Sequence, residues 1–288
     1  MAPVSPTIAR WELMLRIGSR AEERGEKAHT LARAIDVSPQ YWSKLVKGRG
    51  VLTEQKLSAL VKLLEFDPDE QDELLALRED AKGSLPFAEF SALFTDPLLR
   101  YCGLESGASA MRSFENAVVS GLLQTEDYMR ALMKSSGTTY RPTEAEQRLR
   151  ARLHRQRRLE GPNAMRLSVV MGQASLMYQV GSPAIQRDQL HHLSVLADRH
   201  PDTLSIRVIP FEAGTSLASL NASTFHLLSF DSPWLPVLGW MENGPLGEIV
   251  EDGRRVDALE YLFEQEERIA LSQGESLELI DKIARKIG

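Results

Sequence analysis

The segment from His29 to Arg49, HTLARAIDVSPQYWSKLVKGR, restricts the fold of this chain more than any other part of the sequence. An Asp-Val pair in its middle predicts a turn after a first short helix. Ser38 is then a good N-cap for a second helix, and Pro39 occupies the first helical position, where its missing N–H group costs no hydrogen bond. Gly48 is expected to end that helix. The segment therefore predicts two short helices joined by a tight turn.

The second helix is predicted to have one apolar and one polar face. At about 100° per residue, Trp42, Leu45 and Val46 form one stripe, which we expect to be buried. The other side, with the residue that follows the helix, carries the candidate binding residues Gln40, Tyr41, Ser43, Lys44, Lys47 and Arg49. Amide, hydroxyl and amine groups on one helix face suit the base edges and phosphates of a DNA duplex. A small helical bundle with a solvated polar face is the alternative interpretation.

The surrounding sequence predicts a separate N-terminal domain of five helices. Residues 1–62 hold 11 Lys and Arg against 6 Asp and Glu, whereas residues 63–82 hold 2 against 8. A basic head before an acidic stretch fits a small nucleic-acid module on an acidic body, although random surface variation would give the same counts. With 288 residues the chain is long enough for two domains. We expect a helix-turn-helix domain over 1–82, a linker over 83–86 and a second domain over 87–288.

The second domain is predicted to be of the α+β class. Helical patterns are expected at about 97–113, 126–134, 143–160, 183–199, 254–271 and 275–287. Runs typical of strands cover 166–171, 204–209, 224–230, 236–241 and 246–250. Because three of these runs follow one another closely after residue 204, we expect a mainly antiparallel sheet with helices packed against it.

The N-terminal pattern resembles the helix-turn-helix of the Cro/phage-repressor (xenobiotic response element) family. The matching residues are Leu31-Ala32, Val37-Ser38, Ser43-Lys44-Leu45 and Gly48-Arg49. The resemblance implies binding to operator DNA, usually as a dimer, with the second helix of the motif in the major groove. The sequence departs from the family at Ala28, where a Gln that contacts DNA is common.

Several strings in the second domain resemble the C-terminal domain of actinobacterial antitoxin-like transcriptional regulators. Among them are LESGASAMRSFE (104–115), SGLLQTEDYMRALM (120–133) and RVIPFEAG (207–214). The resemblance implies a transcriptional regulator that is often encoded beside a small partner protein. From the residues themselves, Thr125 is expected to cap a helix that begins with two acidic residues. The Arg-rich run 148–158 is either an ion-paired or solvated face, or a surface for anions, an acidic partner or the DNA backbone.

The sequence shows no catalytic or metal-binding motif. No two of the six His have the HExxH spacing, the single Cys102 excludes a Cys-rich zinc site, and no phosphate-binding Gly-rich loop is present. No apolar run is long enough to cross a membrane, and the first residues lack the apolar core of a secretory signal. We therefore expect a cytoplasmic protein that is not an enzyme, has no metal or other cofactor and does not contact a membrane.

Three functions remain open at this point. The first is a dimeric, sequence-specific transcriptional regulator that binds double-stranded DNA through residues 1–82. The second is an antitoxin-like module whose main role is to hold a small partner protein, which the absent Gln at position 28 favours. The third is a sensor whose second domain encloses a small-molecule effector. In the first case, residues 87–288 would serve for dimerisation and for receiving a signal from a partner protein or a ligand.

Overall fold

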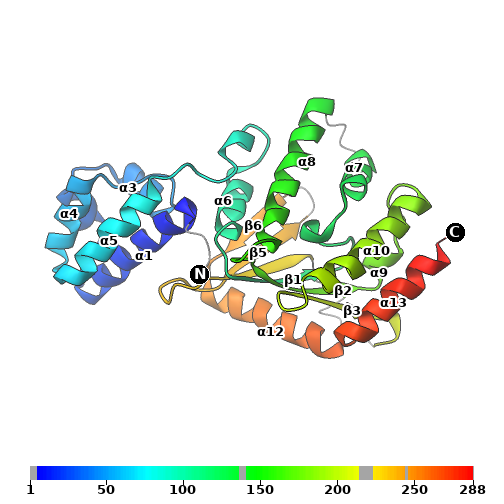
Figure 1. The fold of residues 1–288 in the computed structure, drawn as a ribbon. Coiled ribbons are helices and arrows are strands. Elements are labelled where there is room, and N and C mark those ends of the chain that lie inside the picture. Colours follow the sequence, from blue (N-terminus) through cyan, green and yellow to red (C-terminus); the bar gives the residue numbers. More distant parts are fainter. Residues whose placement is uncertain (1–4, 136–140, 214–222, 244–245, 288) are drawn as a thin grey trace.

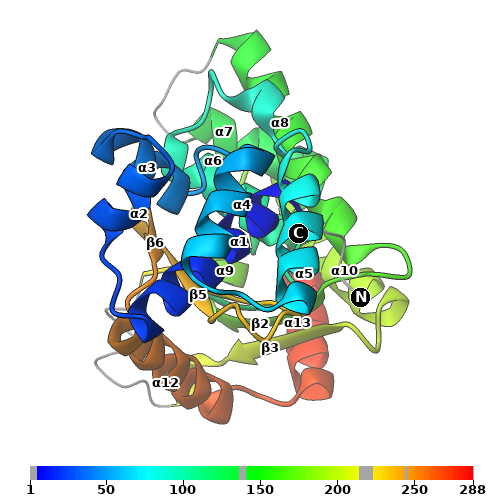
Figure 2. The same ribbon diagram turned by 90° about the vertical axis from the view of Figure 1, so that its left-hand side faces the viewer.

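The N-terminal lobe is a bundle of five helices, as the sequence predicts (Figure 1). The structure is a computed structural model, and it describes residues 5–135, 141–213, 223–243 and 246–287. The helices of this lobe are α1 (Pro6–Glu23), α2 (Ala28–Ala34), α3 (Pro39–Val46), α4 (Glu54–Leu63) and α5 (Pro68–Ala81). Figure 2, which views the lobe end-on, shows α2 and α3 side by side along one of its edges.

Local sequence signals account for the ends of these helices. Gly25, with a φ of +69°, follows α1 in the left-handed conformation that glycine adopts most easily. The Thr53 hydroxyl accepts a hydrogen bond from the Lys56 backbone N–H at the start of α4. Asp67 and Glu70 form a reciprocal capping box at the start of α5. Each cap satisfies N–H groups that the helix itself leaves unpaired.

The body of the protein combines a sheet with helices, which confirms the predicted α+β class. Its strands are β1 (Ala110–Glu115), β2 (Arg166–Gly172), β3 (Leu204–Ile209), β4 (Phe225–Ser229), β5 (Leu238–Asn243) and β6 (Leu246–Val250). Its α-helices are α6 (Asp96–Glu105), α7 (Glu126–Ser135), α8 (Pro142–Gln156), α9 (Ala174–Met177), α10 (Pro183–Arg199), α12 (Gly253–Ile269) and α13 (Gln273–Lys286). Short 3-10 turns occupy Ala88–Phe90, Gly121–Leu123, Arg157–Leu159 and Phe211–Ala213.

The six strands form one mixed sheet in the order β3-β2-β1-β4-β5-β6. The pairs β1–β2 and β2–β3 are parallel, and β1–β4, β4–β5 and β5–β6 are antiparallel. Antiparallel pairs are thus the larger share, but half of the sheet is a parallel unit that the sequence analysis did not predict. Its strands alternate with helices, because the connection between parallel strands has to cross from one end of the sheet to the other.

One predicted helix was wrong over its second half. The helix expected over 97–113 ends at Glu105, and Ala110–Glu115 forms the central strand β1. This strand carries Ser113 and Glu115 on a buried face, and neither residue is more than 3 % exposed. Polar residues on that face hide the alternation of apolar and polar residues that identifies a strand.

Helices cover both faces of the sheet (Figure 1). On one face, β-strand residues such as Leu167 and Ile206 share a core with α6, α8, α10 and α13. On the other face, Phe114 and Phe225 pack against α12 through Phe263. None of the helices within the described ranges is long and apolar enough to span a membrane.

Helix α1 joins the N-terminal lobe to the body. Ile8 and Trp11 belong to the core on the sheet face that α6, α8, α10 and α13 cover. Leu13 and Ile17 belong to the core of the N-terminal lobe. The Trp11 ring meets the Phe230 ring edge-on, with 5.5 Å between their centroids. Helix α1 is therefore buried on two sides, one in each lobe.

Candidate nucleic-acid interface

The helix-turn-helix segment has the local geometry that its sequence predicts. The turn between α2 and α3 places Asp36 at a φ of +49°, a conformation that Asp tolerates better than most residues. The Ser38 hydroxyl accepts a hydrogen bond from the Tyr41 backbone N–H at 3.1 Å, and Pro39 begins α3. The cap and the turn together fix the direction in which α3 leaves α2.

Two apolar side chains hold α3 against the lobe. Trp42 is 8 % exposed and Leu45 is fully buried. Val46 was predicted to join this stripe, and this prediction was wrong, because its side chain is 47 % exposed. Val46 is the last residue of α3, where the chain turns away and no neighbouring helix covers it.

All six candidate residues are exposed to solvent. They are Gln40, Tyr41, Ser43, Lys44, Lys47 and Arg49. The first four lie on α3, and the other two follow its last turn. The side chains of Gln40, Lys44 and Lys47 make no hydrogen bond or ion pair within the part of the chain that the structure describes. Their donors are therefore available to a ligand without breaking an internal contact.

Two of the candidates contact other side chains. The Lys56 ammonium group lies 6.0 Å from the centre of the Tyr41 ring and donates to the Ile35 carbonyl at 3.0 Å. Lys56, at the start of α4, is a cation beside the candidate surface that the sequence analysis did not select. Arg49 forms an ion pair of 3.2 Å with Asp96 at the start of α6. Because Asp96 belongs to the body, this contact links the end of the candidate surface to the other lobe.

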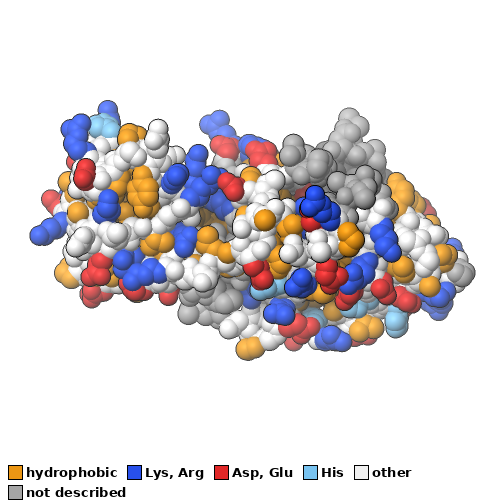
Figure 3. Space-filling model, turned by 90° about the horizontal axis from the view of Figure 1, so that it is seen from above, with side chains coloured by type: hydrophobic (Ala, Val, Ile, Leu, Met, Phe, Trp, Pro, Cys, Tyr) orange, Lys and Arg blue, Asp and Glu red, His pale blue; other side chains and the backbone are white. Residues whose placement is uncertain are grey.

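The positive charge of this region continues onto the neighbouring surface. Figure 3 shows Lys and Arg side chains over the N-terminal lobe and where the lobe meets the body. Carboxylates on α5 neutralise two cations of α1: Arg16 pairs with Glu73 at 2.6 Å and Arg20 with Glu70 at 2.5 Å. The cations near α3 have fewer such partners, so the basic character of the lobe concentrates near α3.

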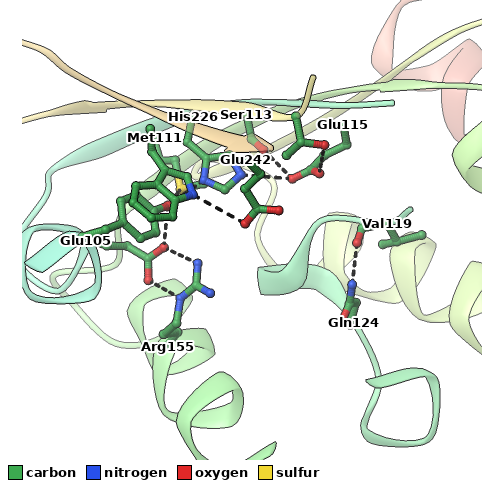
Figure 4. Close-up of polar contacts among 12 residues, drawn as sticks. Glu105, Met111, Ser113, Glu115, Val119, Gln124, Arg155, His226 and Glu242 are labelled. Carbon is green, nitrogen blue, oxygen red and sulfur yellow. Dashed lines mark hydrogen bonds and ion pairs between the residues drawn. The ribbon is translucent and has the colours of Figure 1, made fainter. Parts of the chain in front are cut away.

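The body holds a second polar cluster, which is buried (Figure 4). The Tyr101 hydroxyl lies 3.0 Å from Glu105 and 2.7 Å from Nδ1 of His226. The other ring nitrogen of His226 lies 3.4 Å from Glu115, which also accepts a hydrogen bond from Ser113 at 2.7 Å. Burial, together with the Glu105 charge, raises the pKa of Tyr101 well above its ordinary value. The phenol is therefore neutral and acts as a hydrogen-bonding group.

The groups of this cluster are all buried, whereas a nucleophilic catalytic site has to admit a substrate. Such a site needs a hydroxyl hydrogen-bonded to a base, with the base oriented by a third group. Tyr101, His226 and Glu115 form such a chain, but the Tyr101 hydroxyl is buried and neutral. Ser113 lies opposite His226 across β1 and β4, but its hydroxyl donates to Glu115 and makes no hydrogen bond with His226 among the described residues. Ser113 is also fully buried. The cluster thus satisfies polar groups between the sheet and α6.

Several arginines of the run 148–158, on α8 and the 3-10 turn after it, are used inside the body. Arg155 forms a two-point ion pair with Glu105, at 2.8 and 2.7 Å. Burial opposes the charge of Arg155, but Glu105 more than offsets this effect, and the pKa of Arg155 is raised well above its ordinary value. Arg148 donates to the Leu93 carbonyl and Arg158 to the Ala108 carbonyl, both at 2.8 Å. One ion pair and two hydrogen bonds to carbonyls thus use these three arginines within the protein.

The structure confirms one smaller sequence prediction and places the single cysteine. Thr125 caps α7, because its hydroxyl accepts a hydrogen bond from the Tyr128 backbone N–H at 3.3 Å. Cys102 is a buried free thiol, and burial raises its pKa to about 12. Within the described residues, no group of three or more His, Cys, Asp or Glu side chains is placed to hold a metal ion.

The five-helix lobe and the capped turn between α2 and α3 define a helix-turn-helix protein. In agreement, residues 12–74 match the family model described as a helix-turn-helix domain. Residues 98–282 match a second model, described as Domain of unknown function (DUF5753), and the chain belongs to this family. No curated protein and no solved structure matches the chain.

Proposed function

We propose that the protein is a sequence-specific, DNA-binding transcriptional regulator of the Cro/phage-repressor type, and not an enzyme. The observation that carries the proposal is the polar face of α3, which offers uncommitted side-chain donors from a helix fixed by its cap and by Trp42 and Leu45. A second helix of a helix-turn-helix enters the major groove with such a face. The match of residues 12–74 to a helix-turn-helix model supports this use of the lobe.

The proposal gives the six residues two roles. Gln40, Tyr41, Ser43 and Lys44 would read base edges, because Gln can pair with adenine through two hydrogen bonds and Lys can reach guanine. Lys47 and Arg49 would contact phosphates and fix the position of the helix on the duplex. Both roles require side chains that are exposed to solvent, as all six are, although Arg49 would have to exchange its ion pair with Asp96 for a phosphate.

We also propose that the regulator acts as a homodimer under the control of its body. One helix-turn-helix covers a single half-site, and two-fold symmetric operators present two half-sites about one helical turn apart. The body would supply the dimer contacts and receive a signal from a small partner protein or a small ligand. An antitoxin-like chain whose main role is to hold a partner protein is the second candidate, and Ala28 on α2 favours it.

Selection of binding sequences from a random duplex library by the full-length protein tests the proposal. The selected duplex should bind wild type tightly, and Lys44→Ala and Gln40→Ala should each cost on the order of 1–3 kcal/mol of binding free energy. Lys62→Ala, which removes an exposed Lys on α4, is the matched control and should have little effect.

The salt dependence of binding provides a second measurement. Each phosphate contact releases counterions, so affinity should fall steeply as salt is added, with a smaller slope for Lys47→Ala. Fluorescence anisotropy with a labelled duplex gives both quantities. The proposal is rejected if the selection enriches no duplex sequence. It is also rejected if the α3 substitutions leave the affinity for the selected duplex unchanged. Retention of a stoichiometric small protein from the native host without DNA would favour the second candidate.

A further inference from the structure

A cleft of about 610 Å³ lies where the N-terminal lobe meets the body. Its walls come from the end of α3, from α6 and from β6, and they include Lys47, Arg49, Asp96, Leu99, Arg100 and Ile249. A volume of this size suits a small organic molecule, and such sites often lie between domains. The residues that follow the candidate DNA-reading helix thus also form one side of a cavity.

The carboxylates that line the cleft already have cationic partners. Asp96 pairs with Arg49, Glu251 receives two hydrogen bonds from Arg100 at 2.9 and 2.8 Å, and Glu248 pairs with Arg255 at 2.8 Å. None of these three acidic groups needs a cation from a ligand. The acidic residues of the cleft therefore do not make it a site for a cationic molecule.

Two of the cations that line the cleft have no carboxylate partner among the described residues. The Lys47 ammonium group makes no contact of this kind, and Arg10 donates only to backbone carbonyls, to Ala81 at 2.8 Å and Gly83 at 3.5 Å. Partial burial lowers the pKa of Arg10, which shows that removal from water costs this charge some of its stabilisation. An anion in the cleft would restore it.

Apolar side chains form another part of the lining. Leu85, Pro97, Leu99 and Ile249 contribute carbon surface beside the charged groups. We propose that the cleft binds a small organic anion with an apolar body, a carboxylate or phosphate whose head contacts Lys47 and Arg10. The apolar part of the ligand lies against the leucine and isoleucine side chains, where it leaves water.

Binding of this anion would compete with binding of DNA, a step that rests on the proposed function. Lys47 and Arg49 are the proposed phosphate-contacting residues, and both line the cleft. When Lys47 binds the anionic group of the ligand, its ammonium group is no longer available to contact a DNA phosphate. The two ligands then weaken each other reciprocally, as linkage requires.

Binding of the fluorescent probe 8-anilinonaphthalene-1-sulfonate to the full-length protein tests the site without DNA. This probe combines an anionic sulfonate with an apolar ring system, so we expect saturable, one-to-one binding. Ser91→Trp, at an exposed position that lines the cleft, should fill it and weaken binding at least tenfold. Lys47→Ala should weaken binding about fivefold or more. Ser58→Trp and Lys62→Ala, both on α4, are the matched controls and should bind as wild type does.

Competition between probes tests the chemical class. Decanoate and decyl phosphate should displace the fluorescent probe, whereas decyltrimethylammonium of equal chain length should not. Whichever of the two anions displaces it at lower concentration identifies the preferred head group. Probe binding that is unsaturable, that survives Ser91→Trp, or that the cation displaces equally well would overturn the proposal.

The effect on DNA is measured separately. With the selected duplex, saturating decanoate should weaken binding about fivefold or more in wild type and leave Ser91→Trp unchanged. If no duplex is ever selected, the proposed function fails while the probe measurements still test the cleft. If the duplex binds but the probe does not, the cleft proposal fails and the regulator proposal stands.

Discussion

Arg155 and Glu105 form an ion pair that is almost entirely enclosed between α8 and α6. The Glu105 side chain is 1 % exposed and that of Arg155 is 16 % exposed. Removing one member of a buried pair leaves an uncompensated charge, so Arg155→Met should lower the free energy of unfolding by about 3–5 kcal/mol. Urea denaturation measures this change.

A double variant separates the charge from the packing at this pair. Glu105→Gln with Arg155→Met leaves no isolated charge, and the protein should regain part of the stability that the single variant loses. Arg130→Met is the control, because its pairs with Glu126 and Glu146 are exposed to solvent and its loss of stability should be much smaller than that of Arg155→Met. Equal losses in Arg155→Met and Arg130→Met would contradict the assigned burial.

Cys102 gives a prediction about reactivity. Its thiol is 2 % exposed, and burial raises its pKa to about 12. The thiolate is the reactive form, so at pH 8 the folded protein should react with Ellman's reagent at least a hundredfold more slowly than the protein in 6 M guanidinium chloride. A native reaction as fast as that of the unfolded chain would show that α6 opens readily at this position.

At the scale of the element, the cap of α3 is the interaction that most directly orients the candidate surface. Ser38→Ala removes the hydroxyl that accepts from the Tyr41 N–H and should cost about 1 kcal/mol of stability. Because Gln40 and Tyr41 lie in the first turn of α3, DNA affinity should fall as well. Thermal unfolding and anisotropy with the selected duplex measure the two effects, and Ser58→Ala, at an exposed position inside α4, is the control.

Most elements could be predicted because their signals are local. The N-cap Ser38 and the α3 residues Pro39 and Trp42 specify the helix start and part of its buried face within a few positions, and the structure confirms these. The exposure of Val46 could not be predicted in this way, because it depends on whether another helix covers the end of α3. The polar face of α3 could be predicted from the helical period alone. The contact of Arg49 with Asp96 could not, because the two residues lie on different lobes.

The sheet shows the same limit more strongly. Five of its six strands follow from runs of apolar residues, but β1 carries Ser113 and Glu115 on its buried face and was taken for helix. Its partner His226 is more than a hundred residues away along the chain. The parallel pairing of β1, β2 and β3 likewise depends on contacts between distant segments. Local propensity carries no information about such partners.

At the scale of the whole molecule, α1 makes the two lobes parts of one structure. The Ser5 hydroxyl donates to the Gly103 carbonyl at 2.7 Å, and Thr7 lies so close to Gly103 that a β-carbon there would come within 2.3 Å of its hydroxyl oxygen. Ile8 and Trp11 then enter the core of the body. Because α1 also carries core residues of the N-terminal lobe, unfolding either lobe exposes apolar surface in the other.

We therefore expect a single cooperative unfolding transition for wild type, and its separation into two transitions in Trp11→Ala. The Trp11 side chain is 4 % exposed. Truncating a buried Trp lowers the free energy of unfolding by about 3–5 kcal/mol, and at this position the loss weakens the contact between the lobes. Differential scanning calorimetry distinguishes one heat-absorption peak from two. Tyr261→Ala, at a side chain on α12 that is 65 % exposed, is the control and should keep one peak. Two peaks already present in wild type would mean that α1 couples the lobes too weakly for a signal in the body to reach α3 through it.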